Sequence, residues 1–570
     1  MSQTSEIAEA KPEAASKTSL KTALDLFYEW EAKKANQAYL RQPIEGKWKV
    51  FTWGQVGEEV RRMAAALKAL HLPEKSNIGL VSKNCAHWIM ADLAITLAGH
   101  ISVPFYPSLT AAQLQQVLTH SQCKALFVGK LEVWKDMKAG VSKDIQVIAF
   151  PHYPGNDLIE GPGFLHWDAL MQAHPPLREN YYPDLRDLRT IIYTSGTTGN
   201  PKGVMFDHYT LAAPMEEGAK ALEIEGECRF FSYLPMCHIA ERALVEGGSL
   251  VSGGEVYFAE SLDTFAHNLQ VAQPTHFMAV PRIWTKFQMG VLSKMPQAKL
   301  NRLLKIPLVS RLVKNKIRKG LGLSKARLIL TGAAPMPVTV IEWFKKLDIH
   351  IQEVYGMTEN GGACTVMPKG EVKMGTVGKP YSYVKVKIDE ENNEVLMTSP
   401  GVMLGYYREP EMTENTFKDG WLRTGDMGEM DREGFLKITG RVKDMFKSAK
   451  GEYIVPGPIE WKFAVNNDIE QICVVGSTLP QPIALVVLSE LGQNRPKEDV
   501  IAGLEALLDK INADLVNYER LHRVVVVKEP WTVENGILTP TLKIKRNVLD
   551  THYQDRLEAW YEQSRKVVFE

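Results

Sequence analysis

Short apolar runs alternate with longer amphipathic stretches up to about residue 440, and this alternation constrains the fold more than any other feature of the chain. Helix-type patterns occupy residues 53–70, 86–98 and 338–347. The apolar runs around them lie at residues 77–81, 125–128, 190–193, 327–330 and 349–354. Strands that alternate with helices are typical of an α/β fold. From residue 383 to 437 strand-like alternation and turn residues take over, which predicts β hairpins around turns at 390–393 and 431–434.

The length of 570 residues is too great for a single compact domain. We expect a large α/β body of several subdomains over residues 20–442 and a small α+β domain over 443–570. For the small domain the sequence predicts strands at 472–476, 483–488 and 524–527 and helices at 496–515 and 544–562. Residues 1–19 are rich in Ala, Ser, Glu and Lys and contain no apolar core, so we expect a disordered tail and no secretory signal.

A loop suited to phosphate follows the run at 190–193, where residues 193–204 read Tyr-Thr-Ser-Gly-Thr-Thr-Gly-Asn-Pro-Lys-Gly-Val. Its glycines allow a phosphate to approach closely, and successive backbone N–H groups can form an anion-binding concavity. A flexible linker is the alternative, but linkers have no reason to end in Pro-Lys-Gly-Val. The Walker A pattern does not fit, because Lys202 stands between Pro201 and Gly203. The residues we expect to hold phosphate are Tyr193, Thr194, Ser195, Gly196, Thr197, Thr198, Gly199 and Lys202.

Two further segments close apolar runs, at the strand ends where ligands gather in open α/β sheets. In Tyr355-Gly356-Met357-Thr358-Glu359 the ring can stack on a purine, Thr358 can donate to phosphate, and Glu359 offers the hard oxygen that Mg²⁺ prefers. Alone this segment is equally a strand end followed by a turn. The other segment follows the run at 327–330 and supplies the nucleotide-binding candidates Gly332, Ala333 and Ala334. The first supplies Tyr355, Gly356, Met357 and Thr358.

Asp426 and Arg441 complete the set of candidate polar side chains. Asp426 follows a glycine and is suited to bonding the two hydroxyls of a ribose, and Arg441 supplies a fork-shaped donor. Surface Asp and Arg residues are common, so each is weak evidence alone. In their order and spacing, however, these segments resemble the motifs of the acyl-adenylate-forming enzymes, which comprise acyl-CoA synthetases, luciferases and peptide-synthetase adenylation domains. The resemblance extends over about residues 20–570.

The resemblance implies a ligase that uses ATP and Mg²⁺ in two steps through an acyl-adenylate. It assigns the catalytic lysine of the final Lys-Ile-x-Arg motif to Lys543, with Lys545 as the competing assignment, and implies catalytic roles for Lys202 and Glu359. It places Mg²⁺ on Thr194 and Glu359. It also implies that the small domain is mobile about a hinge at Lys443 and turns the segment that begins at Lys447 toward the site for the second step.

Two segments resemble the long-chain fatty acid–CoA ligase branch of this superfamily. They are Thr-Pro-Thr-Leu-Lys at 539–543 and Pro-x-x-His followed by Glu-Arg at 235–242. The branch implies coenzyme A as co-substrate and places His238 at the acyl pocket or its gate, although a lone His in an apolar stretch is more often a core residue. Gly361, Gly362 and Ala363 leave room for an acyl chain, or only shape a turn. The rival functions are an acyl or aryl acid ligase that loads a carrier protein or releases the adenylate, and a catalytically silent lipid-binding homologue.

Charge argues against a nucleic-acid partner, since 67 basic residues balance 67 acidic ones. Six scattered cysteines without a Cys-x-x-Cys pair predict a reduced cytoplasmic protein. One stretch departs from this balance: residues 299–319 carry eight basic side chains and no acidic one, interleaved with apolar residues at near-helical spacing and broken at Pro307. We favour a surface helix whose apolar stripe faces the core. The alternative is peripheral contact with an anionic membrane. Oligomerisation stays open.

Overall fold

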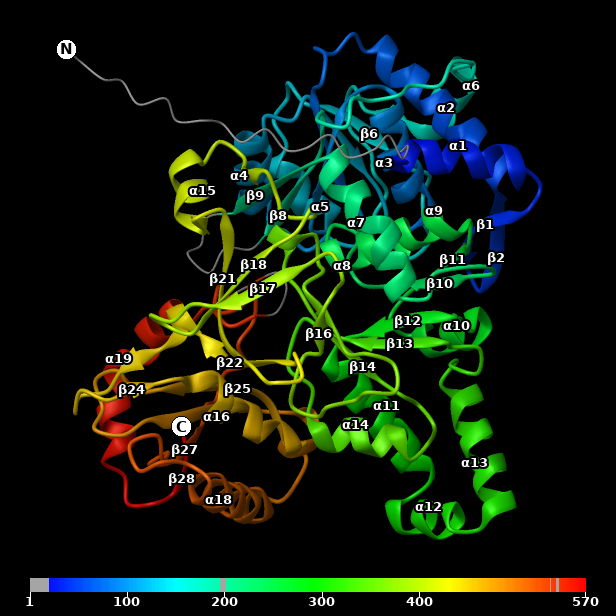
Figure 1. The fold of residues 1–570 in the computed structure, drawn as a ribbon. Coiled ribbons are helices and arrows are strands. Elements are labelled where there is room, and N and C mark those ends of the chain that lie inside the picture. Colours follow the sequence, from blue (N-terminus) through cyan, green and yellow to red (C-terminus); the bar gives the residue numbers. More distant parts are fainter. Residues whose placement is uncertain (1–19, 195–200, 534, 540–542) are drawn as a thin grey trace, which may run out of the picture.

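The computed structural model describes residues 20–194, 201–533, 535–539 and 543–570. It confirms the predicted class: a large mixed α/β body is joined to a smaller C-terminal domain (Figure 1). The predicted tail at 1–19 and the loop residues Ser195, Gly196, Thr197, Thr198 and Gly199 lie outside the described residues.

A mostly parallel sheet forms one half of the body, in the order β19-β9-β8-β4-β3-β5-β6-β7. Its strands are β3 (Asn77–Val81), β4 (Ile101–Phe105), β5 (Ala125–Val128), β6 (Gln146–Ala149), β7 (Leu165–His166), β8 (Leu188–Thr194), β9 (Lys202–Asp207) and β19 (Gly405–Tyr406). Every residue of β3, β4 and β5 is buried, which is why these strands appear in the sequence as continuous apolar runs.

A second sheet forms the other half, in the order β16-β15-β14-β13-β12-β10-β11-β1-β2. Its strands are β1 (Ala38–Ile44), β2 (Lys47–Thr52), β10 (Arg229–Ser232), β11 (Glu255–Phe258), β12 (His276–Ala279), β13 (Leu328–Thr331), β14 (Gln352–Tyr355), β15 (Thr365–Val366) and β16 (Lys379–Pro380). The predicted runs at 327–330 and 349–354 correspond to β13 and β14, each displaced toward the C-terminus by one or more residues.

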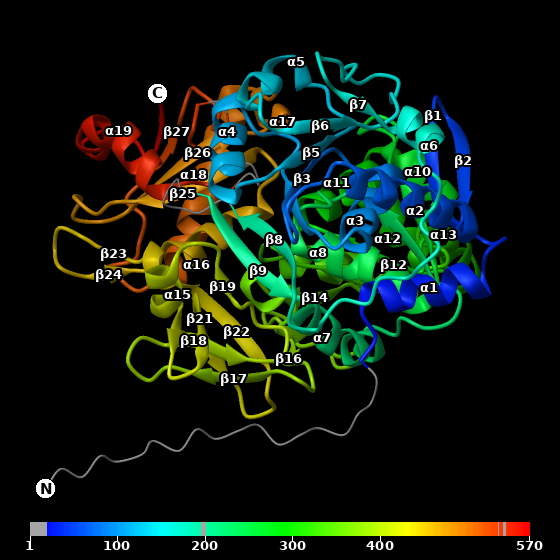
Figure 2. The same ribbon diagram turned by 90° about the horizontal axis from the view of Figure 1, so that it is seen from above.

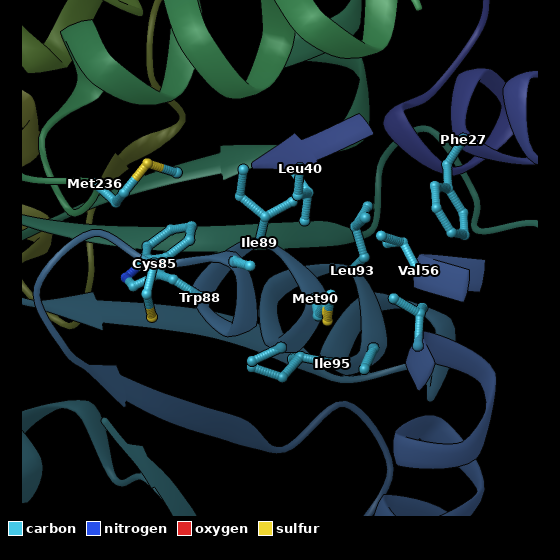
Figure 3. Close-up of a cluster of buried hydrophobic side chains, with 14 of the residues drawn as sticks. Phe27, Leu40, Val56, Cys85, Trp88, Ile89, Met90, Leu93, Ile95 and Met236 are labelled. Carbon is cyan, nitrogen blue, oxygen red and sulfur yellow. The ribbon is translucent and has the colours of Figure 1, made fainter. Parts of the chain in front are cut away.

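Helices cover both sheets (Figures 1 and 2). They are α1 (Ala23–Lys33), α2 (Trp53–Ala69), α3 (Ala86–Leu97), α4 (Ala111–Ser121), α5 (Trp134–Met137), α6 (Trp167–Ala173), α7 (His208–Ala221), α8 (Ile239–Glu241), α9 (Gly248–Ser252), α10 (Phe265–Ala272), α11 (Pro281–Lys294), α12 (Gln297–Leu304), α13 (Pro307–Gly320), α14 (Val338–Lys345) and α15 (Pro410–Thr416). All residues of α3 are buried. Figure 3 shows Ile89, Met90 and Leu93 of this helix within the main core, near Leu40 of β1.

The predicted hairpins are present as a separate antiparallel sheet between the body and the C-terminal domain. Its strands are β17 (Lys385–Ile388), β18 (Glu394–Thr398), β20 (Phe417–Lys418), β21 (Trp421–Met430) and β22 (Leu436–Arg441). Asn393, in the first turn, has φ of 57°, a left-handed conformation that asparagine tolerates.

The C-terminal domain contains a sheet in the order β25-β26-β27-β28 with helices beside it. Its elements are β23 (Phe446–Lys447), β24 (Tyr453–Ile454), α16 (Pro456–Trp461), β25 (Ile469–Val475), β26 (Ile483–Leu488), α17 (Glu490–Gln493), α18 (Lys497–Ala513), β27 (Val524–Val526), α19 (Arg546–Tyr561) and β28 (Val567–Phe569). The strands and helices predicted for this domain correspond to β25, β26, β27, α18 and α19.

The basic segment forms a helical hairpin of α12 and α13, and Pro307 is the first residue of α13. The expectation that its apolar stripe faces the core holds for Leu300 and Ile317, which are buried. It is wrong for Leu308 and Leu312, which are 82% and 70% exposed.

Candidate active site

The two ends of the candidate phosphate loop are fixed by strand pairing. Thr194 is the last residue of β8 and Lys202 the first of β9, and the two residues are partners in an antiparallel register. Tyr193 does not present its side chain to this loop. Its ring is buried beside Phe105, and its hydroxyl hydrogen-bonds His120 Nδ1 at 2.6 Å. Only the backbone of Tyr193 is therefore placed to serve a ligand there.

Lys202 and Glu359 are held near each other around Tyr406 of β19. The Tyr406 hydroxyl donates to Glu359 Oε1 at 2.7 Å, and Lys202 Nζ lies 5.4 Å from the centre of the Tyr406 ring. Burial lowers the pKa of Lys202 and the nearby charge of Lys443 lowers it further, whereas Glu359 raises it. Glu359 is itself buried. No motif pointed to Tyr406, because this residue lies some 200 residues from Lys202 in the chain and follows no recognisable pattern.

Asp426 is clamped by two of the predicted residues. The Tyr355 hydroxyl donates to Asp426 Oδ2 at 2.7 Å, and Arg441 Nε lies 2.9 Å from Asp426 Oδ1. Strand pairing explains the second contact, since Asp426 of β21 and Arg441 of β22 are register partners. Burial raises the pKa of Asp426, while Arg441, Tyr355 and Lys543 lower it.

Lys543 approaches this group from the C-terminal domain. Crowding by the surrounding protein lowers the pKa of Lys543 although the residue stays exposed to solvent, Arg441 lowers it further, and Asp426 and Glu359 raise it. Burial, and to a lesser degree the positive charge of Lys543, lowers the pKa of His238 to about 4. Lys545 stands instead at the start of α19, where its backbone N–H donates to the Ile537 carbonyl at 2.8 Å. The structure thus brings Lys543 to the candidate site and uses Lys545 at a helix terminus.

Close backbone packing shapes the floor of the site. A Cβ on Gly356 would stand 2.3 Å from the Gly362 carbonyl oxygen, so only glycine allows these two turns to touch. Ala333 adopts a φ of 64°, which is uncommon for a residue other than glycine. Such strained conformations cluster at functional sites. Segment 331–335 begins with buried Thr331 at the end of β13. Its backbone conformation is therefore imposed by the surrounding fold and not by the local preferences of its residues.

A cavity opens beside the charged group, and the empty space in it, including the part open to solvent, amounts to about 1410 Å³. Asn360, Gly361, Gly362 and Ala363 line it directly after Glu359. Arg189, Thr190 and Ile192 line it too, so it runs along β8 for about 10 Å at the usual rise per residue. The charged residues Arg242 and Glu246 also line it. Much of its remaining wall is apolar and comes from α7 and the segments that follow it: Leu211, Ala212, Pro214, Met215, Ala219, Leu222, Ile224, Ile239, Ala240, Ala243 and Leu244.

His238 stands beside the cavity, and its role at the acyl pocket or its gate stays a prediction. Its neighbours Ile239 and Ala240 line the cavity, whereas His238 caps α8, with Nδ1 accepting the Ala240 N–H at 3.2 Å. Lys443 lies near Lys202 at the end of the hairpin sheet. Lys447 lies on β23, with Nζ 5.5 Å from the ring centre of Tyr453.

A buried charge cluster lines the start of β8, and the sequence did not reveal it. Arg189 and Arg242 both pair with Asp92, and Arg242 also pairs with Glu246 at 3.1 Å. Burial tends to raise the pKa of Asp92, but the two arginines hold it well below its usual range. Arg242 and Glu246 belong to a π-helical segment, Arg242–Gly247, of a kind often found at functional sites.

Comparison with known families identifies the family to which the chain belongs. Residues 27–407 match the AMP-binding enzyme family, and residues 443–565 match the AMP-binding enzyme C-terminal domain. The chain belongs to the AMP-binding enzyme family. It is thus an acyl-adenylate-forming enzyme, as its motifs indicated, and an ATP-dependent ligase by membership of that family.

Individual relatives and structures are similar over nearly the whole chain. Long-chain-fatty-acid–CoA ligase 5 of Rattus norvegicus is 29% identical, over 93% of this chain and 85% of its own. The adenylation domain of a carboxylate reductase from Mycobacterium chelonae has a TM-score of 0.78 at 23% identity, with 95% of this chain and 91% of that chain covered. O-succinylbenzoate coenzyme A synthetase from Bacillus subtilis, solved with ATP and magnesium, has a TM-score of 0.71 at 22% identity and covers 92% and 99%. The two structures share the fold.

Within the part of the chain that the structure describes, no helix combines the length and the apolar character needed to cross a membrane.

Proposed function

We propose that this adenylate-forming enzyme ligates a long-chain fatty acid to coenzyme A, releasing AMP and pyrophosphate. The observation that carries the proposal is the cavity, which begins at Gly361, Gly362 and Ala363 beside Glu359 and continues along β8 between largely apolar walls. Burying each methylene contributes about 0.8 kcal/mol, so such a cavity favours long chains. The full-length similarity to a rat long-chain-fatty-acid–CoA ligase supports the same substrate class.

In the first step an oxygen of the fatty carboxylate attacks the α-phosphorus of ATP. The new O–P bond forms as the bond from the α-phosphorus to the bridging oxygen breaks, and pyrophosphate leaves. Two anions must meet, so the step needs positive charge where negative charge accumulates. Lys543 would supply it at the α-phosphoryl group, and Lys202 beside the phosphate loop. Asp426, oriented by Tyr355 and Arg441, would accept hydrogen bonds from the ribose hydroxyls.

The donor set at Glu359 fits magnesium. Mg²⁺ is commonly held by one or two protein oxygens together with substrate phosphates, and the buried Glu359 carboxylate and the Thr194 hydroxyl are oxygen donors of this kind. When bound, Mg²⁺ neutralises charge on the phosphate oxygens. Tyr406 would hold Glu359 in place by the hydrogen bond to Oε1.

In the second step the sulfur of coenzyme A attacks the acyl carbonyl carbon, the C–S bond forms, and the bond from that carbon to the AMP oxygen breaks. Lys543 must move away so that the pantetheine can enter. We place the domain boundary and the hinge at Lys443, where the family match to the C-terminal domain also begins. Rotation there would bring the segment from Lys447 onward toward the adenylate. The described cysteines are buried and free, which supports a reducing compartment such as the cytoplasm.

The test is pyrophosphate release from ATP over a panel of aliphatic and aromatic acids, with and without coenzyme A. We expect the highest kcat/KM with long aliphatic acids and an acyl-CoA product that depends on coenzyme A. Preference for aromatic acids, or full turnover without coenzyme A, would support the carrier-loading or adenylate-releasing alternative. No release with any acid would indicate a silent lipid-binding homologue.

A further inference from the structure

The hairpin of α12 and α13 has two apolar faces, although a surface helix needs only one. The inner face carries Leu300 and Ile317, both buried, and Leu304 and Val313 pack against the same core cluster. These residues attach the hairpin to the body beside α14. They satisfy the ordinary requirement for an amphipathic helix, so the remaining apolar residues need another explanation.

The outer face exposes large apolar side chains where the two helices join. Ile306, Leu308 and Leu312 are 49%, 82% and 70% exposed. Leu308 and Leu312 are four residues apart on α13 and therefore lie on one face of the helix. Single exposed leucines are common, but a contiguous group of them marks an interaction surface.

Positive charge surrounds this apolar group. The eight basic residues between 299 and 319 meet no acidic residue in their own segment, although the whole chain is neutral. One of them, Lys314, pairs with Asp348 of the body at 2.9 Å. Lys305, Arg311, Lys316 and Lys319 are exposed. Arg311 is three residues after Leu308 and Lys316 is four after Leu312, so charge and apolar surface occupy the same side of α13.

We propose that the α12–α13 hairpin docks the enzyme on an anionic lipid surface. Leu308 and Leu312 would enter the interface between headgroups and acyl chains, while Arg311, Lys316 and Lys319 would contact the lipid phosphates. Figure 1 shows the hairpin at the edge of the body, across the view from the C-terminal domain. Docking through it would leave that domain free to rotate.

Co-sedimentation of the full chain with vesicles tests the proposal without relying on the ligase activity. We expect binding to vesicles of phosphatidylcholine with 30% phosphatidylserine at low salt, weaker binding at high salt, and little binding to phosphatidylcholine alone. Leu308→Glu with Leu312→Glu should weaken binding at least tenfold, and Arg311→Glu with Lys316→Glu similarly. The matched controls are Leu262→Glu, an exposed leucine outside the hairpin (91% exposed), and Lys138→Glu with Lys143→Glu; both should bind as the unchanged protein does.

Three results would overturn the proposal. The first is no vesicle binding by the unchanged protein at low salt. The second is an equal loss of vesicle binding in the Leu262→Glu control. The third is a protein that does not bind vesicles but forms concentration-dependent dimers, which Leu308→Glu abolishes. The last would assign the surface to a second copy of the chain. Thermal unfolding of each variant checks that loss of binding does not reflect loss of the fold.

Discussion

Lys543 and Lys545 show how far single residues could be assigned from the sequence. The motif selected Lys543 over its neighbour two positions on, and the structure brings Lys543 into electrostatic contact with Asp426 and Glu359. Tyr406 could not be found in the same way. The contribution of Tyr406 to the site is one hydrogen bond to Glu359. That contact forms because β19 pairs with β9 beyond the phosphate loop. Contacts made by chain folding leave no trace in local sequence.

Replacing Lys543 by alanine should abolish adenylation. Removing one group that stabilises developing charge commonly costs 10²–10³-fold in rate, so pyrophosphate release should fall by about that factor. Thioester formation from a supplied acyl-adenylate should be largely spared, and Lys545→Ala serves as the matched control. Near-normal release by Lys543→Ala together with failure of Lys545→Ala would show that Lys545 is the catalytic lysine.

Glu241 should make the stability of the body pH-dependent. It is buried, accepts hydrogen bonds from the Tyr233 N–H at 2.9 Å and Asn84 Nδ2 at 3.2 Å, and burial raises its pKa to about 8. The folded protein therefore keeps this proton up to about pH 8, while the unfolded chain releases it above about pH 4.5. Stability contributed by the protonated group is full below pH 4.5 and is lost as the pH rises to 8, by at most about 1.4 kcal/mol per unit.

Glu241→Gln tests this because the amide is neutral at every pH and its oxygen can accept the same two hydrogen bonds. We expect the variant to unfold near the temperature of the unchanged protein at pH 5 and clearly above it at pH 8, as measured by thermal scans. Parallel curves for the two proteins across that range would contradict the assignment.

At the scale of elements, β8 and α7 determine how much of the cavity an acyl chain can use. Gly218 lies on α7 and lines the cavity, and the nearest atom to an added Cβ is the Tyr383 hydroxyl at 3.5 Å, an ordinary contact. Larger side chains at this position are thus compatible with the helix and would project into space available to substrate.

Gly218→Leu should shift the enzyme toward shorter acids. Filling the space of about two methylenes costs long chains about 1.6 kcal/mol, or roughly fifteenfold in kcat/KM, while short acids should be unaffected. The measurement is kcat/KM across chain lengths. Gly503→Leu is the control, since Gly503 is also helical and has no neighbour within 4 Å of an added Cβ. An equal loss at every chain length would show that the cavity does not hold the acyl chain.

Elements were predictable wherever their burial was uniform or their turns carried glycine and asparagine. The strand at 77–81 and the helix starting at residue 53 match β3 and α2 because burial and capping act locally. The outward turn of Leu308 was not predictable, since helical spacing reveals a stripe and not what covers it. The cluster around Asp92 joins residues from α3, β8 and the π-helical segment, and no spacing rule links them.

For the whole molecule, the orientation of the C-terminal domain determines which half-reaction the site can carry out. In the orientation seen here, Arg282 of α11 in the body pairs with Glu470 of β25 in that domain. Lys443→Pro should restrict the proposed hinge, because proline fixes φ. Adenylate formation should survive and transfer to coenzyme A should fail, whereas Lys443→Ala should retain both. The test is to measure adenylate formation and transfer to coenzyme A separately in each variant. Equal loss of both would indicate misfolding and count against a hinge there.

The crowding of cations around the site has a thermodynamic consequence. Arg441 lowers the pKa of Lys543, as Lys443 lowers that of Lys202, so bringing the two domains together without an anion is partly self-repelling. A bound polyphosphate removes that repulsion and so favours the closed arrangement of the domains. By linkage, anything that closes the domains must also raise the affinity of the enzyme for the nucleotide. The triphosphate is then both a substrate and the counter-charge that makes the assembled site stable, and the release of pyrophosphate withdraws most of that counter-charge at the moment when Lys543 has to leave.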